Sequence, residues 1–375
     1  MDGLPDDVLV HIMSHLELPE LLHCRLVCRR IAPLALHPDV WRHRYFTYRD
    51  RELCTVLRLA PCLNAIKVKV PWPWCHLLFT APCAVRCVSV TISGREGAAA
   101  QAALLLRHQK ELGRLRKVRV LFRRAEEGPP LTKTDASVLF GTLVSTPDLD
   151  ALSVGGVNCD LAAHAPVEAS PPVLHRTVAA SLKHFRCDLA PGLGLFCDAV
   201  LATHSATLVG VALMSARTPP TPSTAALLVA MPHLADLICP IFAGMDALAA
   251  SASLRRLKLS GSPLADAAAR AAAPAAARLL RRAHQLRAVH IGYSLNLPKD
   301  VELIAAMATS GLSHVESLSI ENTTLSFPQL QELLGALPRL PALNRLTVYS
   351  APDELQLDIR PVTAAGLRNF FNLTA

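Results

Sequence analysis

Charged and aromatic residues are both scarce in this chain. Asp, Glu, Lys and Arg make up 18% of its 375 residues and the aromatic residues 5%, whereas 51% are hydrophobic. A composition this apolar excludes wholesale disorder. Two of the longest stretches without a charged residue, 199–216 and 218–235, are interrupted by hydroxyl and histidine side chains or by prolines. Neither stretch is therefore expected to form a membrane-spanning helix.

The basic start of a secretory signal is also missing. The chain opens on Met1, and the next seven positions include Asp2, Asp6 and Asp7. We therefore expect a soluble protein of the cytoplasm, the nucleus or both. In those compartments the eleven cysteines are expected to be reduced and mostly buried.

Motifs of catalysis and cofactor binding are absent as well. The sequence holds no Walker A loop, G-x-G-x-x-G, G-x-S-x-G or H-E-x-x-H pattern. His11 and His15 have a spacing that can hold a metal, but no Cys or carboxylate set accompanies them, so we interpret them as a solvent-exposed helix face. Two C-x3-C pairs are interpreted as packing residues: Cys24 with Cys28, and Cys83 with Cys87. We expect no catalytic residue, no metal and no cofactor.

The N-terminal region is predicted to be a small helical module. Leu9, Ile12, Met13 and Leu16 fall on one stripe of a helix, and Pro19 suits the first turn of a second one. A module of about 40 residues rarely buries enough surface to be stable alone. This module also carries more apolar residues than short helices can hide, which indicates a partner-binding surface. The alternative is that these residues form only the core of a helical cap.

The order of these apolar positions resembles the F-box, with one departure at Leu18, where that family often has a polar residue. In F-box proteins the module docks on the small adaptor of an SCF-type cullin–RING ubiquitin ligase, and the resemblance implies the same adaptor, and through it a cullin, as partners here. The adaptor-binding residues are predicted to be Leu4, Pro5, Val8, Leu9, Ile12, Leu16, Leu21, Leu22, Val27, Cys28 and Trp41.

From residue 63 onward a hexad, apolar-x-x-apolar-x-apolar, recurs roughly every 28 residues. The eleven hexads begin at Leu63, Val85, Leu115, Leu149, Leu182, Leu208, Leu234, Leu254, Leu286, Val315 and Leu343. The intervals carry helix signals at 98–112, 135–144, 300–309 and 329–337, and at 265–286, which Pro274 is expected to break. Strands in register with helices outside predict a curved parallel sheet, a solenoid.

This pattern resembles leucine-rich repeats, although the Asn that this family often places after the strand is missing from most repeats. We predict an α/β fold: an F-box helical module at 1–50, followed by a leucine-rich-repeat solenoid of about 11 repeats at 51–375. Trp72 and Trp74 are expected to cap the first repeat. This combination implies a non-catalytic substrate receptor of an SCF ubiquitin ligase, whose repeats capture a target protein for ubiquitination.

Charge is concentrated at the hexad positions expected to face solvent. Positions 1, 4 and 6 should point into the core, and positions 2, 3, 5 and 7 should line the concave side. Five anions are found there: Asp150, Asp188, Asp236, Glu316 and Glu321. Thirteen cations are found there and are the predicted substrate-binding residues: Lys67, Lys69, Arg86, Arg116, Lys117, Arg119, Lys183, Arg186, Arg255, Arg256, Lys258, Arg287 and Arg345. The difference equals the net charge of the whole chain, +8.

A basic concave face should attract an acidic or phosphorylated target. The alternative is that long basic side chains only cover the sheet and keep it soluble. Two other functions stay open. One is a protein-interaction scaffold outside ubiquitination. The other is RNA binding, which the near-absence of aromatic side chains at these positions disfavours, Tyr349 being the exception.

Overall fold

The structure is a computed structural model of the whole chain. It describes residues 3–71, 76–93, 97–123, 133–156, 179–190, 193–215, 220–261, 266–293, 300–309, 313–321, 335–350 and 355–359. The chain divides into two compact units. Unit 1 comprises Met1–Cys159 and Glu168–Val178, and unit 2 comprises Asp160–Val167 and Ala179–Ala375.

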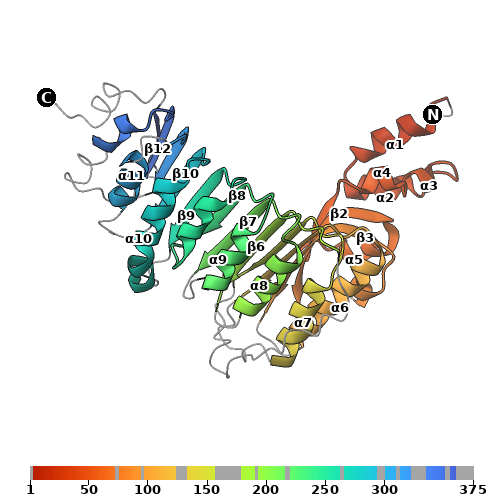
Figure 1. Cartoon of the computed structure of the whole chain (residues 1–375). Coiled ribbons are helices and arrows are strands. Elements are labelled where there is room, and N and C mark those ends of the chain that lie inside the picture. Colours follow the sequence, from red (N-terminus) through yellow and green to blue (C-terminus); the bar gives the residue numbers. More distant parts are fainter. Residues whose placement is uncertain are drawn as a thin grey trace. The chain divides into compact units, whose positions relative to one another are not determined.

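Unit 1 begins with four short helices and continues into a parallel sheet (Figure 1). The four helices are α1 (Asp6–Ser14), α2 (Leu18–Cys24), α3 (Ile31–Leu34) and α4 (Pro38–Trp41). The strands, in order across the sheet, are β1 (Tyr45–Thr47), β2 (Cys62–Val70), β3 (Ala84–Ile92), β4 (Lys117–Phe122) and β5 (Ala151–Gly155). The connections hold α5 (Leu53–Leu59), the short 3-10 helix η1 (His76–Phe79), α6 (Ala98–Glu111) and α7 (Lys133–Val144).

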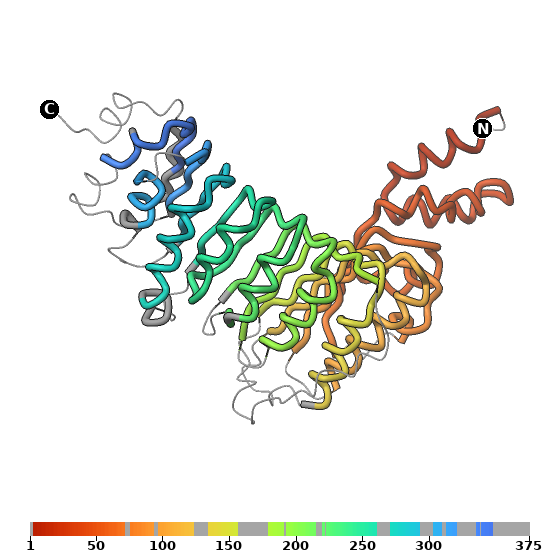
Figure 2. Tube along the Cα trace, in the orientation of Figure 1, coloured from red at the N-terminus to blue at the C-terminus, as the bar shows by residue number. Residues whose placement is uncertain are grey.

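Unit 2 repeats the strand–helix alternation. Its strands are β6 (His184–Leu189), β7 (Gly210–Ser215), β8 (Asp236–Cys239), β9 (Arg256–Gly261), β10 (Ala288–Tyr293), β11 (Ser317–Glu321), β12 (Arg345–Ser350) and β13 (Leu355–Ile359). Neighbouring strands are parallel except for β13, which is antiparallel to β12. The connections hold α8 (Gly194–Thr203), α9 (Pro222–Val229), η3 (Met245–Ala250), α10 (Asp266–Arg282), α11 (Asp300–Thr309) and η5 (Leu337–Arg339). Figure 2 shows that the helices of unit 2 lie along one face of its strands.

The predicted hexads align position by position. In unit 1 the fourth positions Ile66, Val88, Val118 and Leu152 are partners across β2–β5. In unit 2 the same position aligns from β6 to β12 through Phe185, Val211, Leu237, Leu257, Val289, Leu318 and Leu346. All the side chains at positions 1, 4 and 6 that the structure describes are buried. The predicted fold class is thus confirmed: each unit is an open parallel sheet with one strand per repeat, as in a leucine-rich-repeat solenoid.

In three connections a polar side chain near the end bonds to the backbone at or just before the start of the strand that the connection follows. In unit 1 the amide of Gln109, at the end of α6, accepts a hydrogen bond from Val85 N at 2.8 Å and donates to the carbonyl of Cys83 at 3.1 Å. In unit 2 His204 Nδ1, after α8, accepts from Ser181 N at 3.2 Å. Gln285, after α10, donates to the carbonyl of Ser251 at 2.9 Å. These bonds supply partners for backbone groups at or just before the starts of β3, β6 and β9.

Several local predictions need correction. The helix α10 runs through Pro274 and is not broken there, because alanines on both sides of the proline and leucines after it are buried. The strands β1 and β13 were not predicted, since neither carries the hexad. Helix α7 begins at Lys133, two residues before the start predicted for this helix. Most of the predicted helix at 329–337 lies outside the described residues. Trp72 and Trp74 both lie outside them.

The predicted boundary near residue 50 stays a prediction, since the first four helices and the first repeats fall in the same compact unit. The sulfur of Cys62, the first residue of β2, lies 3.6 Å from the carbonyl of Pro38 in α4. Among the described residues, no helix is both long and apolar enough to cross a bilayer.

Candidate functional site

The N-terminal module has its own small core. Leu9 and Met13 of α1, Leu21 of α2 and Trp41 of α4 are buried. The indole nitrogen of Trp41 donates to the carbonyl of Ala35 at 2.8 Å, which satisfies the polar atom of the largest buried ring. The first-turn Asp side chains and the Glu17–Glu20 capping box stabilise the starts of α1 and α2. The module therefore has a packed interior of its own.

One arginine joins the helices of the module. The guanidinium of Arg44 donates to the carbonyls of Val40 at 3.0 Å and Leu16 at 2.8 Å. It also lies over the ring of Trp41, 5.6 Å from the centroid. Desolvation by burial lowers the pKa of Arg44, and the charge of Glu17 opposes that effect. The backbone carbonyl of Arg44 accepts from the backbone N–H groups of Asn64 and Ala65 in β2, so this residue also links the module to the sheet.

A group of large apolar side chains on the module is left exposed. Val8 and Ile12, one turn apart on α1, are 37% and 46% exposed. Leu26 and Val27 follow the end of α2 and are 82% and 62% exposed. Leu4 completes the set, and its carbonyl is bonded by Arg30, which also pairs with Asp6 at 2.7 Å. We call Leu4, Val8, Ile12, Leu26 and Val27 the apolar module surface.

The predicted adaptor-binding residues divide by burial. Pro5 and Cys28 are exposed like the apolar module surface, and Leu16 and Leu22 are half-buried. Leu9, Leu21 and Trp41 are in the core, so they support the surface and do not offer contacts to a partner. Leu26 was not in the predicted set. It is exposed because α2 ends at Cys24, two residues before it. A prediction of a shorter second helix would have placed Leu26 outside that helix.

In unit 1 the solvent-facing side of the sheet is basic. Lys67 of β2, Ser89 of β3 and Arg119 of β4 are register partners, and Lys117 is the partner of Cys87 two residues earlier. Lys67, Lys69, Arg86, Lys117 and Arg119 form no ion pair with any residue that the structure describes. Arg116, the remaining predicted cation of this unit, donates to the carbonyl of Asp148 at 2.9 Å. We call Lys67, Arg86, Lys117 and Arg119 the unpaired basic face.

Two other titratable groups feel these charges. Burial raises the pKa of the half-buried Cys87 thiol, and the cations Lys117, Arg119 and Arg86 oppose that rise. Hydrogen bonding to Arg49 lowers the pKa of Tyr48, with smaller contributions from the charges of Arg49, Arg123 and Lys67. At both groups the contribution of the cations lowers the pKa, which is the sign expected for a positive potential on this side of the sheet.

In unit 2 three of the predicted cations lie beside acidic side chains. Arg256 of β9 makes two hydrogen bonds to the carboxylate of Asp236 on β8, which raise its pKa. Arg287 pairs with Glu316 at 3.2 Å. Arg186 lies 3.9 Å from Asp188 on its own strand. All three of these arginines were predicted to contact a target, and all three are at least partly neutralised within the protein.

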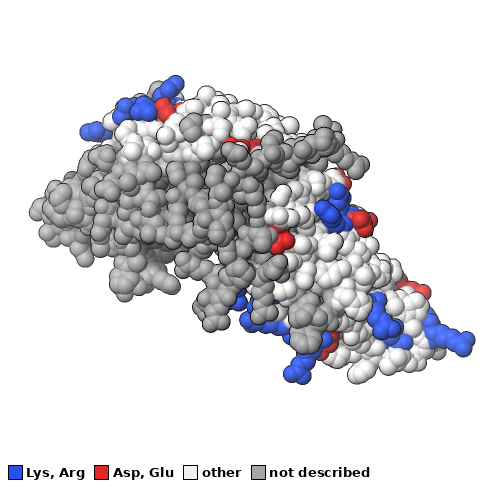
Figure 3. Space-filling view, turned by 90° about the horizontal axis from the view of Figure 1, so that it is seen from below, with Lys and Arg blue, Asp and Glu red and all other residues white. Residues whose placement is uncertain are grey.

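Unit 2 also holds a hollow of about 330 Å³ over the strands β8–β11. Its lining includes the paired Asp236 and Arg256, together with Ile238, Lys258, Ala288, His290, Ser317 and Ser319. Small side chains at Ala288, Ser317 and Ser319 leave this space open. On the face seen in Figure 3, lysine and arginine side chains form separate small groups among uncharged residues, several with an acidic neighbour.

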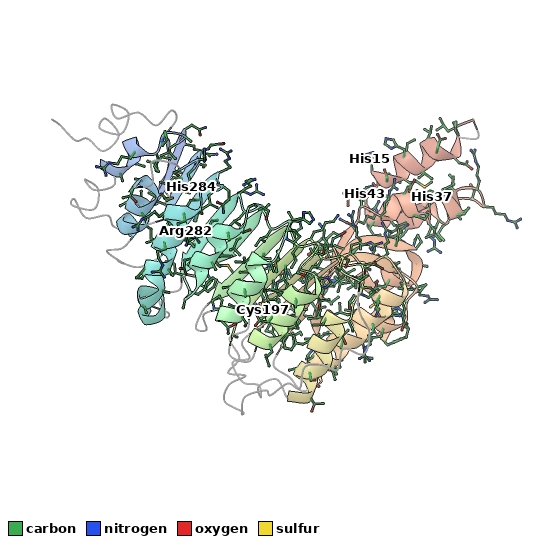
Figure 4. All side chains as sticks on the ribbon, viewed as in Figure 1. His15, His37, His43, Cys197, Arg282 and His284 are labelled. Carbon is green, nitrogen blue, oxygen red and sulfur yellow. The ribbon has the colours of Figure 1, made fainter. Side chains whose placement is uncertain are left out.

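The cysteines of the described residues are free thiols. Burial raises the pKa of Cys83 and of Cys239 to about 12. A hydrogen bond to Cys187, followed by burial, raises the pKa of Cys197, which lies on α8 (Figure 4). These thiols are therefore protonated at neutral pH and unsuited to nucleophilic chemistry. Cys28 is exposed, so the interpretation of that pair as packing residues is wrong for one member.

Among the residues with assigned positions, no group of three or more His, Cys, Asp or Glu is placed to hold a metal. The rings of His11 and His15 meet edge to face, with centroids 5.0 Å apart. This contact is compatible with the solvent-exposed helix face expected from the sequence.

Comparison with known proteins assigns the module. A family model described as F-box-like matches residues 1–47, which contain the whole apolar module surface. No curated protein matches the chain. F-box domains bind the small adaptor of SCF complexes, and F-box proteins are generally non-catalytic adaptors. The match supports a general role in SCF-type ubiquitin ligases.

Proposed function

We propose that this protein is the substrate-recognition subunit of an SCF-type E3 ubiquitin ligase. The module binds the ligase adaptor, and through it a cullin, while the repeats of the two units capture a target protein. The receptor raises the local concentration of the target's lysines near the ubiquitin-carrying enzyme, so that the transfer chemistry belongs to other subunits. We place this function in the cytoplasm or the nucleus.

The observation that carries the proposal is the apolar module surface within the F-box-like match. Five of the nine large apolar side chains exposed in the described parts of the chain belong to it. Exposed apolar groups cost free energy in water unless a partner covers them, and clusters of them mark interaction sites. Val8 and Ile12, one helical turn apart, suit an amphipathic helix that lies in a groove of its partner.

Point substitutions test the adaptor contact more cleanly than removal of residues 1–46, which would cut β1 and take away the carbonyl of Arg44 that β2 uses. In the full chain, Val8→Glu with Ile12→Glu should weaken capture of the purified adaptor roughly 30-fold or more, because charges would be buried at the interface. The matched control is Leu104→Glu with Leu195→Glu, two exposed leucines on α6 and α8. Equal adaptor binding by both double variants would disprove the proposed contact.

A reconstituted ligase separates the receptor from a scaffold outside ubiquitination. The full chain, adaptor, cullin–RING core and charged conjugating enzyme should transfer ubiquitin to lysines of the chain itself, because a receptor is held within reach of the donor. The Val8→Glu, Ile12→Glu variant should lose this transfer. Adaptor binding without any transfer would favour the scaffold.

A further inference from the structure

We propose that the unpaired basic face of unit 1 is a binding site for a phosphorylated segment of the target protein. The inference rests on the proposed function, since it names the chemical class of ligand that the receptor recognises. It also narrows the site. The thirteen predicted cations are reduced to four of the cations on β2, β3 and β4 that no acidic group of the described protein neutralises.

The first argument is geometric. Lys67, Ser89 and Arg119 are aligned across three adjacent strands, so the two cations are roughly 10 Å apart at their Cα atoms with a hydroxyl between them. Lysine and arginine side chains are long enough to meet over that central residue. Lys117 lies on the same strand two residues before Arg119, on the same side of the sheet. Donors from these positions can therefore reach one anion placed over Ser89.

The second argument is electrostatic. Like charges on neighbouring strands repel one another, and unit 2 shows how this chain relieves such repulsion, with Asp236 beside Arg256 and Glu316 beside Arg287. On the unpaired basic face the four cations have no such partner among the described residues. An anionic ligand would supply the missing charge. Association should therefore gain both attraction to the ligand and relief of repulsion within the sheet.

The third argument favours a phosphate over a carboxylate as the bound anion. A phosphate group carries close to two negative charges and three acceptor oxygens, enough for two cations and a hydroxyl together. The hydroxyl of Ser89 has no hydrogen-bond partner within the described protein and is half-buried between the cations. A guanidinium such as that of Arg119 matches two phosphate oxygens with a fork of two donors.

A phosphorylated peptide is favoured over RNA by the lack of stacking surfaces. The solvent-facing positions of β2, β3 and β4 carry no aromatic side chain, whereas single-stranded nucleic acids are held by several stacked bases. Tyr45, on the edge strand β1, is an exposed aromatic ring on this side of the sheet, and Tyr48, just after that strand, is close enough to feel the charge of Lys67. Two rings at one edge do not provide the series of platforms that a nucleic-acid strand needs.

Binding of the full chain to two short-peptide libraries tests the proposal. One library has a fixed central phosphoserine, and the other has serine at that position. The wild-type chain should bind the phosphorylated library roughly tenfold or more tightly. Lys67→Glu with Arg119→Glu should abolish that preference. The matched control is Arg255→Glu with Lys258→Glu, which changes the net charge equally on the sheet of unit 2 and should preserve it.

Each outcome decides the matter. An equal loss in the two double variants would mean that only overall charge matters and would overturn the site, as would the absence of any preference for phosphoserine. Preferential binding of poly(U) RNA that the phosphopeptides do not displace would assign the face to nucleic acid. Circular dichroism checks folding, and Lys67→Gln with Arg119→Gln serves if the reversed pair does not fold. Adaptor capture by the same proteins should be unchanged, so failure here is distinct from failure of the proposed ligase role.

Discussion

In unit 1 the cations on the solvent-facing side of β2–β4 have no acidic partner among the described residues, whereas in unit 2 Arg256 and Arg287 lie beside Asp236 and Glu316. The buried sides of the two sheets do not differ in this way, since the same hexad positions fill both cores. The comparison teaches that the buried pattern specifies the strand register, while the exposed positions of the same strands are free to diverge. Recognition is therefore expected to differ between the two units even though their repeats have the same architecture.

The largest expected effect is the loss of stability when a core leucine is truncated, and it tests whether the cores of the two units are equally well packed. Leu152→Ala in unit 1 and Leu257→Ala in unit 2 should each cost about 2–5 kcal/mol of unfolding free energy, because both side chains are fully packed. Segment-resolved hydrogen exchange reports the loss in each unit separately. The exposed controls Leu104→Ala and Leu195→Ala should change stability by about 0.5 kcal/mol or less. If either core variant lost no more stability than its exposed control, the hexad positions would not be equally well packed in the two sheets.

The next prediction concerns the module that precedes the sheet of unit 1. Arg44→Ala should destabilise α1 and β1 by about 1.5–3 kcal/mol, since it removes charged hydrogen bonds to the carbonyls of Val40 and Leu16. Arg42→Ala, which breaks an exposed pair with Asp39, should cost about 0.5 kcal/mol or less. Exchange protection of α1 in the two variants is the measurement. Equal exchange protection of α1 in the two variants would show that the hydrogen bonds of Arg44 do not stabilise the module.

A third prediction contrasts Gln109 in unit 1 with His204 in unit 2, which make the same kind of bond to an earlier turn. Burial lowers the pKa of His204. The unfolded chain therefore takes up the proton first, and the unfolding free energy of unit 2 should fall as the pH drops through about 6.5. His204→Gln should flatten this dependence, and Gln109→His should introduce it into unit 1. Urea denaturation between pH 7.5 and 5 is the measurement. An unchanged pH dependence in His204→Gln would show that His204 is not the source of it.

The smallest effect is expected from unpairing one arginine in unit 2. Asp236→Asn should cost about 0.2–1 kcal/mol, because the Arg256 side chain is 68% exposed. It should nevertheless increase the affinity of the full chain for heparin, since it makes this sheet resemble that of unit 1. Asp246→Asn breaks a pair with Arg278 away from the sheet face and should leave heparin binding unchanged. Equal heparin binding by both variants would show that pairing does not distinguish the two faces.

The strands were predictable because every hexad buries three apolar side chains at fixed positions. Phe46 of β1 is a single buried residue without a hexad, so that strand carried no repeating signal. The continuity of α10 through Pro274 depends on tertiary packing, which overrides the local preference of proline. The match of the first 47 residues to the F-box-like family agrees with the order of apolar positions read from the sequence.

The candidate sites were predictable only in part. Asp236 and Arg256 both occupy position 3 of adjacent repeats, so a charge count made position by position would have found their pairing, whereas the count over the whole face did not. The same holds for Arg287 and Glu316 at position 2. The burial of Leu9, Leu21 and Trp41 depends on how three short helices pack, and their apolar character alone did not separate core from surface.

The hydrogen bonds of Gln109, His204 and Gln285 have a consequence for protein synthesis. Each donor or acceptor side chain is made 23 to 34 residues after the backbone group that it binds. While the ribosome is still adding those residues, the turns at Cys83, Ser181 and Ser251 have no such partner and are open to water or chaperones. In these three repeats the turn at the start is thus completed only when the side chain at the end of the same repeat has been made.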